Sequence, residues 1–352
     1  MKTTLLIAAA LFVCLSAGAQ TNSYTVTPIV NNTQDPYLIN PWGLSRPVKS
    51  TLGENEWWAS DNGTGYTTLY YADRNGSNSL APLVISIPTA LGAGVGSPTG
   101  TVYNGNTGPG PGKNNFAFAT LDGTISNWNA GQLPAVKGTG CYECHVTSAT
   151  VVVNRGRAGA SYTGLTIANA AGTNAPTFYA ANNNAGVETY DAATFKHVVF
   201  TGKFTDPQIP TSYKPYGIQT IGNNVWVTFF NGSAGGFVDA FDVSGKLKKR
   251  LAQGSFSEPW GVAQAPANFG SLSNAILVGN VTSGWIAAFD STTGAFKDYL
   301  RDSGGNIITL PGLWGISFGN GNHESGPTNT LYYAAGGVDE KTGVFGAITA
   351  NQ

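Results

Sequence analysis

The residues with the most specific chemistry form a Cys-x-x-Cys-His sequence at Cys141, Cys144 and His145. This spacing is the attachment pattern of c-type haem, in which both thiols form thioethers and the histidine ligates the iron. The same residues could instead form a disulfide across a short loop, or a Cys/His metal site. The disulfide is the simplest of these three interpretations because it needs no cofactor.

A haem group would also need a second axial ligand. Met1 is the only methionine, and the remaining histidines are His197 and His323. We expect His197 to be the better candidate, because the repeats described below place it in the unit next to the cysteines. The cysteines themselves lie in an insertion between Trp128 and Val151, which we expect to decorate a repeat unit rather than build it.

A second group of candidate ligands consists of Asn and Asp side chains in or beside glycine-rich turns. They are Asn40, Asp61, Asn62, Asp122, Asn182, Asn231 and Asn280. Carboxylate and amide oxygens are the ligands that Ca²⁺ prefers, so several of them on one face would suit a calcium site. Tight turns favour the same residue types for their backbone hydrogen bonds, which is the structural alternative. A Ser-His-Asp set is not recognisable among so few histidines.

Repeats provide the elements that must position these residues. A short opener, an aromatic residue or threonine followed by glycine and usually an aliphatic residue, recurs six times. The openers lie near residues 42, 99, 163, 216, 260 and 314. This spacing fits the roughly 40 to 50 residues of a four-stranded propeller blade with loop insertions.

Each unit continues with strand-like segments separated by Asn-Gly and Asp-Gly turns, which suit tight hairpins. We therefore predict an all-β fold, a six-bladed β-propeller with four-stranded blades, over residues 20–352. The last unit contains only three strands, so Tyr24–Val30 is predicted to be its outer strand and to close the ring. Trp42 and Leu44 are expected on the same face of their strand, because side chains alternate with period two.

The two faces of the predicted propeller differ in the turns and links that form them. Turns between the second and third strands, and links between blades, share one face of a propeller, here called the loop face. The Asn and Asp candidates are expected to gather on this face around the central channel.

The composition agrees with blades that are packed on both faces. Glycine accounts for 47 residues, and only 11% of residues are charged, against about 25% in ordinary soluble domains. Trp57, Trp58, Trp128 and Trp285 are accordingly expected to belong to the core rather than to a glycan-stacking surface. The 18 basic and 19 acidic residues nearly cancel, which gives no electrostatic basis for nucleic-acid binding.

The N-terminal segment has the features of a signal peptide. Lys2 precedes the apolar run Leu5–Leu15, and the small residues Ala17–Ala19 provide a cleavage site. We predict a signal peptide over residues 1–19 and an exported protein, periplasmic or extracellular. No later stretch is apolar enough to span a bilayer, so we expect no membrane span. We also expect a monomer.

Several motifs carry a resemblance to a known family. They are Asn40–Leu44, Ser60–Gly65, Pro98–Gly100, Phe118–Ser126, Pro259–Val262, Val278–Asn280, Gly312–Gly315 and Phe318–Gly321. With these motifs the chain resembles an uncharacterised family of exported bacterial β-propellers related to NHL-type propellers, over nearly all residues after the signal peptide. The resemblance implies the propeller fold and no particular activity. Some members have a C-terminal Pro-Glu-Pro sorting tail, a motif that Ile348–Gln352 lacks.

Three functions follow as hypotheses. The leading one is an exported binding or interaction scaffold, which would use the loop face to hold a protein or glycan. The first alternative is a metal-dependent lactonase- or esterase-type hydrolase at the channel mouth, with Ca²⁺ as its cofactor. The second alternative is a c-type haem redox protein that uses Cys141, Cys144 and His145.

Overall fold

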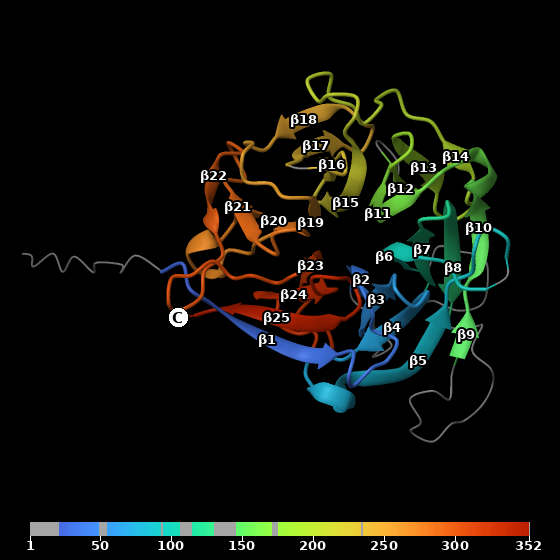
Figure 1. The fold of residues 1–352 in the computed structure, drawn as a ribbon. Coiled ribbons are helices and arrows are strands. Elements are labelled where there is room, and N and C mark those ends of the chain that lie inside the picture. The colour runs from blue at the N-terminus through green and yellow to red at the C-terminus, as the bar shows by residue number, and fades with distance from the viewer. Residues whose placement is uncertain are drawn as a thin grey trace, which may run out of the picture.

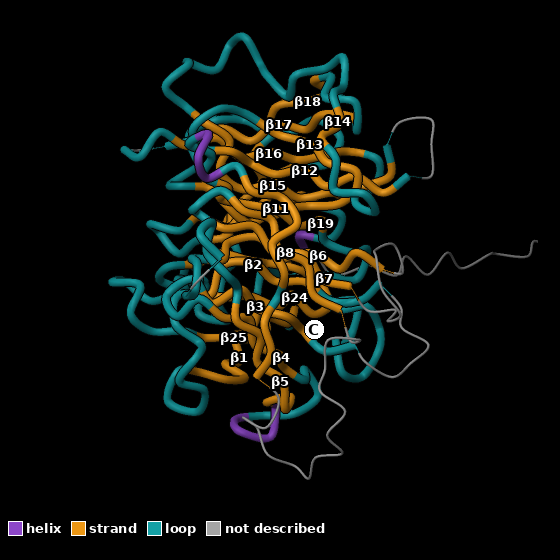
Figure 2. Tube along the Cα trace, turned by 90° about the vertical axis from the view of Figure 1, so that its right-hand side faces the viewer, coloured by secondary structure: helices purple, strands orange, loops and turns teal. Residues whose placement is uncertain are grey.

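The computed structural model describes residues 21–48, 55–92, 94–105, 115–129, 146–170, 175–233 and 235–351. The predicted signal peptide and the motif at Cys141, Cys144 and His145 lie outside the described residues. Six sheets are arranged in a ring around one axis (Figure 1). Seen from the side, the strands form the middle of the molecule and loops cover both faces (Figure 2). The predicted six-bladed β-propeller is therefore confirmed.

In each blade the strand that carries the opener lies innermost, next to the axis. From the axis to the rim, the first blade consists of β2 (Pro41–Ser45), β3 (Trp57–Asp61), β4 (Tyr66–Tyr70) and β5 (Leu80–Ser86). The second blade consists of β6 (Pro98–Gly105), β7 (Asn115–Thr120), β8 (Thr124–Asn129) and β10 (Thr150–Asn154). The third blade consists of β11 (Tyr162–Asn169), β12 (Pro176–Asn182), β13 (Val187–Asp191) and β14 (His197–Val198).

The other three blades have the same order from the axis to the rim. The fourth blade consists of β15 (Lys214–Ile221), β16 (Asn224–Phe230), β17 (Phe237–Asp242) and β18 (Leu247–Arg250). The fifth blade consists of β19 (Pro259–Gln264), β20 (Ile276–Asn280), β21 (Ile286–Phe289) and β22 (Phe296–Tyr299). The last blade consists of β23 (Leu313–Phe318), β24 (Thr330–Ala335), β25 (Val344–Ala350) and β1 (Tyr24–Asn31). Short 3₁₀ helices occur at η1 (Gly76–Ser79), η3 (Gly156–Ala158) and η4 (Gly270–Leu272). In the part of the chain that the structure describes, no helix has the length and hydropathy to cross a membrane.

Strand β1 closes the ring as predicted. It pairs antiparallel with β25, with Tyr24 opposite Ala350. The Tyr24 hydroxyl also donates a hydrogen bond of 2.9 Å to the Phe269 carbonyl in the neighbouring blade. The N-terminal strand thus covers the edge that the last blade would otherwise leave open.

The insertion after β8 departs from the expectation that it only decorates a blade. Its last residues form β9 (Val146–Ser148), which pairs parallel with β5 and becomes a fifth strand of the first blade. Two residues later the chain enters β10, the outer strand of the second blade. The Trp128 indole donates a hydrogen bond of 2.9 Å to the Thr147 hydroxyl. The insertion therefore joins the rims of two blades, because its end adds to an otherwise exposed strand edge.

The blades pack on both faces, and two adjacent tryptophans show this most clearly. Trp57 contacts Tyr332 of the last blade, with ring centres 4.9 Å apart. Trp58 points to the opposite side and stacks on Phe116 of the second blade at 3.7 Å. Both indoles are buried, as is Trp128. The prediction that these three tryptophans belong to the core is confirmed, whereas Trp285 is only half-buried.

The inner strands share an irregularity that the sequence did not predict. In all six, the pairing with the second strand shifts register at the opener. Such β-bulges bend a strand and re-aim its side chains. The expectation that Trp42 and Leu44 share one face is wrong for this reason. Trp42 lies in a cluster at the axis, whereas Leu44 packs between the first and last blades.

Candidate functional site

The channel at the centre of the ring is plugged with aromatic side chains at the loop face. Trp42 stacks on Trp314 with ring centres 3.6 Å apart and planes at 15°. Trp260 meets both rings edge-on at 6.2 and 5.9 Å. The Tyr216 ring lies 6.3 Å from Trp42. We call these four opener residues the aromatic plug.

Hydrogen bonds hold the plug in place. Asn40 accepts a bond of 2.9 Å from the Trp314 indole at its Oδ1 atom. Its own amide donates to Glu340 at 3.0 Å. The Trp260 indole donates across the ring to the Thr163 carbonyl at 2.9 Å. Asn40 was predicted as a ligand residue, and the structure places it as a support of the plug.

Backbone geometry brings the links between blades close to the axis. Asn40 and Glu258 each precede the proline of an opener and adopt positive φ angles of 47° and 61°. Gly312 holds the equivalent place before the last opener, with φ of 67°. Glu258 accepts a bond of 2.8 Å from the Tyr216 hydroxyl, and burial together with this carboxylate raises the pKa of the tyrosine.

Most of the other predicted loop-face residues tie turns or neighbouring blades together. Asn62 donates to the Pro98 carbonyl of the next opener at 3.1 Å. Asn280 accepts a bond of 2.8 Å from the backbone of Ser257. Asn231 is exposed and caps its own turn. These contacts are the ones expected from turn chemistry.

Asn182 is the most heavily bonded of these amides. Its Oδ1 atom accepts bonds of 3.1 Å from the backbone of Ser161 and of Asn184. Its Nδ2 atom donates to Glu188 at 3.0 Å. The side chain is buried, so a substitution there would leave several polar groups without partners.

Two carboxyl groups on the loop face have an oxygen without a protein partner. Asp61 is fully buried, and its Oδ2 atom accepts a bond of 2.8 Å from the Thr68 hydroxyl. Burial raises the pKa of Asp61 well above its ordinary value, and the nearby charge of Asp35 raises it further. Asp122 accepts a bond from the Ala90 backbone. The second oxygen of each carboxyl group is buried without a hydrogen bond.

The structure gives limited information on metal ligands, because five of the seven loop-face candidates are asparagines. Among the described residues, no group of three or more His, Cys, Asp or Glu side chains could hold an ion. His197 is exposed at the start of β14, its ring centre 5.6 Å from that of Tyr190. His323 pairs with Asp73 through its Nδ1 atom at 2.8 Å. The proposed haem ligation and calcium site therefore remain predictions.

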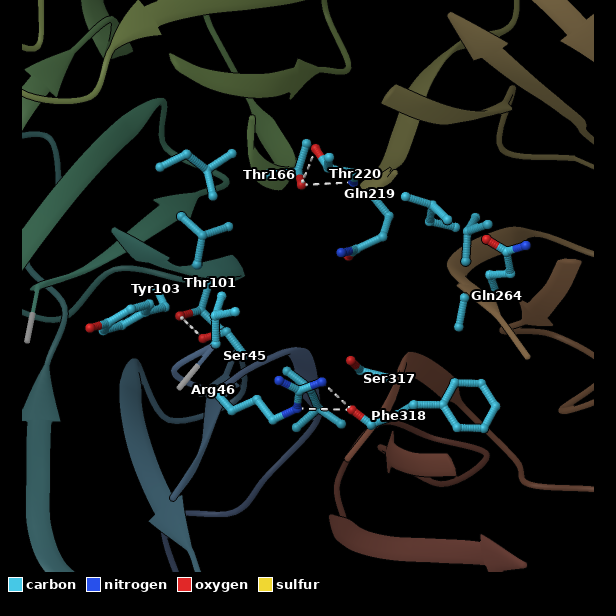
Figure 3. A pocket seen from close by; sticks show the side chains of 17 residues that line it. Ser45, Arg46, Thr101, Tyr103, Thr166, Gln219, Thr220, Gln264, Ser317 and Phe318 are labelled. Carbon is cyan, nitrogen blue, oxygen red and sulfur yellow. Dashed lines mark hydrogen bonds between the residues drawn. The ribbon is translucent and has the colours of Figure 1, made fainter. Parts of the chain in front are cut away.

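At the opposite end of the channel the axis opens into a cup of about 430 Å³ (Figure 3). Inner strands from all six blades contribute to it. Its polar residues are Ser45, Arg46, Thr101, Tyr103, Thr166, Gln219, Thr220, Gln264 and Ser317. We call this space the axial cup.

Hydroxyl pairs link neighbouring blades within the axial cup. Ser45 and Thr101 approach to 3.1 Å, and Thr166 and Thr220 to 3.0 Å. The amide of Gln219 points toward the centre (Figure 3). Arg46 lies between Ser45 and Ser317 with its guanidinium group reaching into the cup (Figure 3). The cup therefore presents donors and acceptors from several blades to one shared cavity.

A constriction separates the cup from the plug. The opener glycines bring the inner strands so close that only about 20 Å³ remains between them, room for about one water molecule. A Cβ atom at Gly217 would lie 2.1 Å from the Trp260 carbonyl oxygen. The two ends of the axis are therefore distinct environments.

The sequence contains a signal for the cup in the residues that follow the opener glycines. Two residues after the opener glycine, four of the six units have a polar side chain: Ser45, Thr166, Gln219 and Ser317. Because the strand alternates after the bulge, this position faces the axis on the side away from the plug. Arg46 stands one residue further in the first unit and has no charged counterpart in the others.

Comparisons with known proteins agree with the fold and leave the ligand open. No protein-family model matches the chain. An uncharacterized protein of Acanthamoeba polyphaga mimivirus is 28% identical over 248 residues, 66% of this chain and 42% of that protein, so the chain spans less than half of its length. Two further uncharacterized proteins of the same virus are 25% and 26% identical over 90% of the chain, and the matches cover 76% and 82% of them.

Two solved structures resemble the fold of this chain. The PQQ-bound aldose sugar dehydrogenase of Streptomyces coelicolor superposes with a TM-score of 0.55 at 11% identity, over 94% of this chain and 100% of that one. A luciferin-regenerating enzyme superposes with a TM-score of 0.50 at 10% identity, over 93% and 95%. At this level of identity the likeness concerns the fold alone.

Proposed function

We propose that the protein is a binding propeller that holds a small, polar molecule in the axial cup. The observation that carries the proposal is the convergence of hydroxyl and amide side chains from all six inner strands on one volume of about 430 Å³. This volume lies within the range of small-molecule sites, roughly 300 to 1,000 Å³. A monosaccharide is the natural first probe, because its hydroxyl groups match such a lining.

The difference in hydrogen bonding between the two ends supports the cup over the loop face. In the part of the chain that the structure describes, the side chains of Gln219, Gln264 and Ser317 have no protein partner. The loop-face amides Asn40 and Asn182 are occupied by protein partners. Unpaired donors and acceptors around a cavity are what a polar ligand would use.

Saturation-transfer NMR with a panel of neutral and acidic monosaccharides tests the proposal. We expect binding by at least one member, and its loss in Ser317→Trp, whose indole would fill the cup. The exposed loop-face residue Asn231 provides the matched control, since Asn231→Ala leaves the cup unchanged. Binding that survives Ser317→Trp in a folded protein, or no binding of any sugar, contradicts the proposal.

Export and the cysteine motif belong to the same proposal. We propose that residues 1–19 direct export, which N-terminal sequencing of protein recovered outside the cytoplasm tests. We expect Cys141 and Cys144 to form a disulfide, and intact-mass analysis with and without a reductant would detect it. A Soret band after co-expression with a haem-maturation system would instead establish c-type haem and overturn the disulfide.

A further inference from the structure

Arg46 is the only charged side chain among the described residues that line the axial cup. Its Nε and Nη2 atoms both donate to the Phe318 carbonyl oxygen, at 2.8 and 2.5 Å. The Nη1 atom reaches the Pro47 carbonyl only at 3.5 Å. The guanidinium carbon lies 5.3 Å from the centre of the Trp57 ring.

Within the described residues, the guanidinium group of Arg46 has no carboxylate partner. The ion pairs of the described residues involve other cations, and none includes Arg46. Burial removes water from around the charge of Arg46 and lowers its pKa to about 10. A partly buried charge without a counter-ion is unfavourable, and an anion that enters the cup would remove this cost.

The free hydrogen-bonding capacity of Arg46 determines the kind of anion. One edge of the group, Nε with Nη2, is held by Phe318. The other edge, Nη1 with the second hydrogen of Nη2, remains for a ligand. A planar carboxylate accepts two parallel bonds from such an edge.

The neutral groups around Arg46 determine the rest of the ligand. The hydroxyl pair of Ser45 and Thr101 lies on one side, and Gln219 and Ser317 also line the cup. These groups donate and accept without charge, as sugar hydroxyls require. We propose that the axial cup binds a hydroxylated carboxylate of monosaccharide size, a sugar acid whose carboxylate pairs with Arg46. This inference rests on the binding function proposed for the same cup.

Titration calorimetry with D-glucuronate, D-galacturonate, the parent neutral sugars and the glucuronate methyl ester tests the inference. The methyl ester keeps the size and hydroxyl groups but removes the charge. Hydrogen bonds to a charged group are worth about twice those between neutral groups, so we expect a uronate to bind about 10- to 100-fold more tightly than its neutral counterparts. Inorganic phosphate is included as a simple anion and is expected to bind more weakly than the uronates.

Three variants separate charge from structure. Arg46→Gln is expected to abolish the preference for the uronate over the neutral sugar. Arg46→Lys keeps the charge without the fork and should retain part of the preference. Arg74→Gln removes an arginine that lies over the Tyr71 ring outside the cup and should change nothing. Circular dichroism verifies that each variant is folded.

The possible results distinguish this inference from the function on which it rests. Neutral sugars that bind as tightly as uronates would overturn the sugar-acid assignment and leave a binding cup in place. Phosphate that binds as tightly as any uronate would also overturn it, because the hydroxylated body would then contribute nothing. A failure of every sugar to bind would contradict both proposals.

Discussion

The two ends of the central axis are built from the same six strands and have opposite properties. At the loop face, Trp42, Tyr216, Trp260 and Trp314 fill the axis, and most of their polar atoms are bonded to protein. At the other end, the next residues of these strands surround an open cup, in which the side chains of Gln219, Gln264 and Ser317 have no partner among the described residues. The register shift and the glycine at each opener separate the two halves. In four of the six units, the residue before the opener glycine belongs to the plug, and the residues after the glycine line the cup.

Removing one plug residue should have the largest effect on stability. Trp314 is almost fully buried, and Trp314→Ala would lose its stacking on Trp42 and its bond to Asn40. We expect a loss of about 3–5 kcal/mol in the free energy of unfolding, the usual range for a buried aromatic truncated to alanine. Denaturant titration measures it.

Trp285→Ala is the control for the plug, because this indole is half-buried at the rim of the loop face. It should cost clearly less than Trp314→Ala. Equal losses for the two variants would show that the plug has no special role in holding the ring.

Adding a methyl group at the constriction should have the next largest effect. In Gly217→Ala the new Cβ would meet the Trp260 carbonyl oxygen at 2.1 Å, and this oxygen belongs to the backbone and cannot rotate away. Overpacking of this kind costs about 1–3 kcal/mol. Gly186→Ala is the matched control, since a Cβ there meets nothing within 4 Å. Thermal unfolding that shifts equally in both variants would contradict the close approach of the inner strands.

The buried carboxyl group at the loop face should make stability depend on pH. Because the pKa of Asp61 is higher in the folded protein than its ordinary value of 3.8, the folded state binds this proton more tightly. The stability that this proton contributes is fully present below pH 3.8. It is lost as the pH rises through the pKa that Asp61 has in the folded protein. The wild type should therefore gain stability relative to Asp61→Asn as the pH falls from neutral.

Asp191 provides a control of opposite sign, because bonds from the Thr194 backbone lower its pKa. The stability that Asp191 supplies should be lost, rather than gained, in acid. Unfolding curves of wild type and both Asn variants across this pH range measure the two differences. A parallel pH profile for wild type and Asp61→Asn would contradict the raised pKa of Asp61.

One amide from each end of the axis gives the smallest and most direct comparison. Gln219 has no protein partner among the described residues, so Gln219→Leu should change the free energy of unfolding by no more than about 0.5 kcal/mol. Asn182→Leu should cost about 1–3 kcal/mol, because it leaves buried partners unsatisfied. Sugar binding should show the reverse pattern and weaken only in Gln219→Leu. Binding that is lost in both variants alike would place the ligand elsewhere.

The propeller was predictable because its signal is repeated. Six openers with similar spacing outweigh any single ambiguous segment, and Tyr24–Val30 was identified as the closing strand because the last unit lacked one. Strand β9 was not predictable, since a three-residue strand has no pattern of its own and forms only where the β5 edge is available.

The site was less predictable than the fold for a physical reason. Alternation predicts which side chains share a face only while the register is regular, and the bulges at the openers interrupt it. The divergence of Trp42 from Leu44 could not be inferred without the pairing of β2 with β3. Arg46 occurs in one unit only, so no repeat pointed to it. The Asn and Asp residues of the loop face were recognisable because tight turns favour these residue types. Hydrogen bonding within turns was therefore already the structural alternative to a calcium site.

The closing strand has a consequence for how the protein reaches its native state. The hydrogen bond between Thr25 and Asn351 joins residues 326 positions apart in the chain. Strand β1 is therefore synthesised long before β25 and must wait for it before it can pair. Contacts between such distant segments slow folding, because a long loop must be ordered before they can form. The last blade is thus completed only after β25 has been synthesised and has paired with β1.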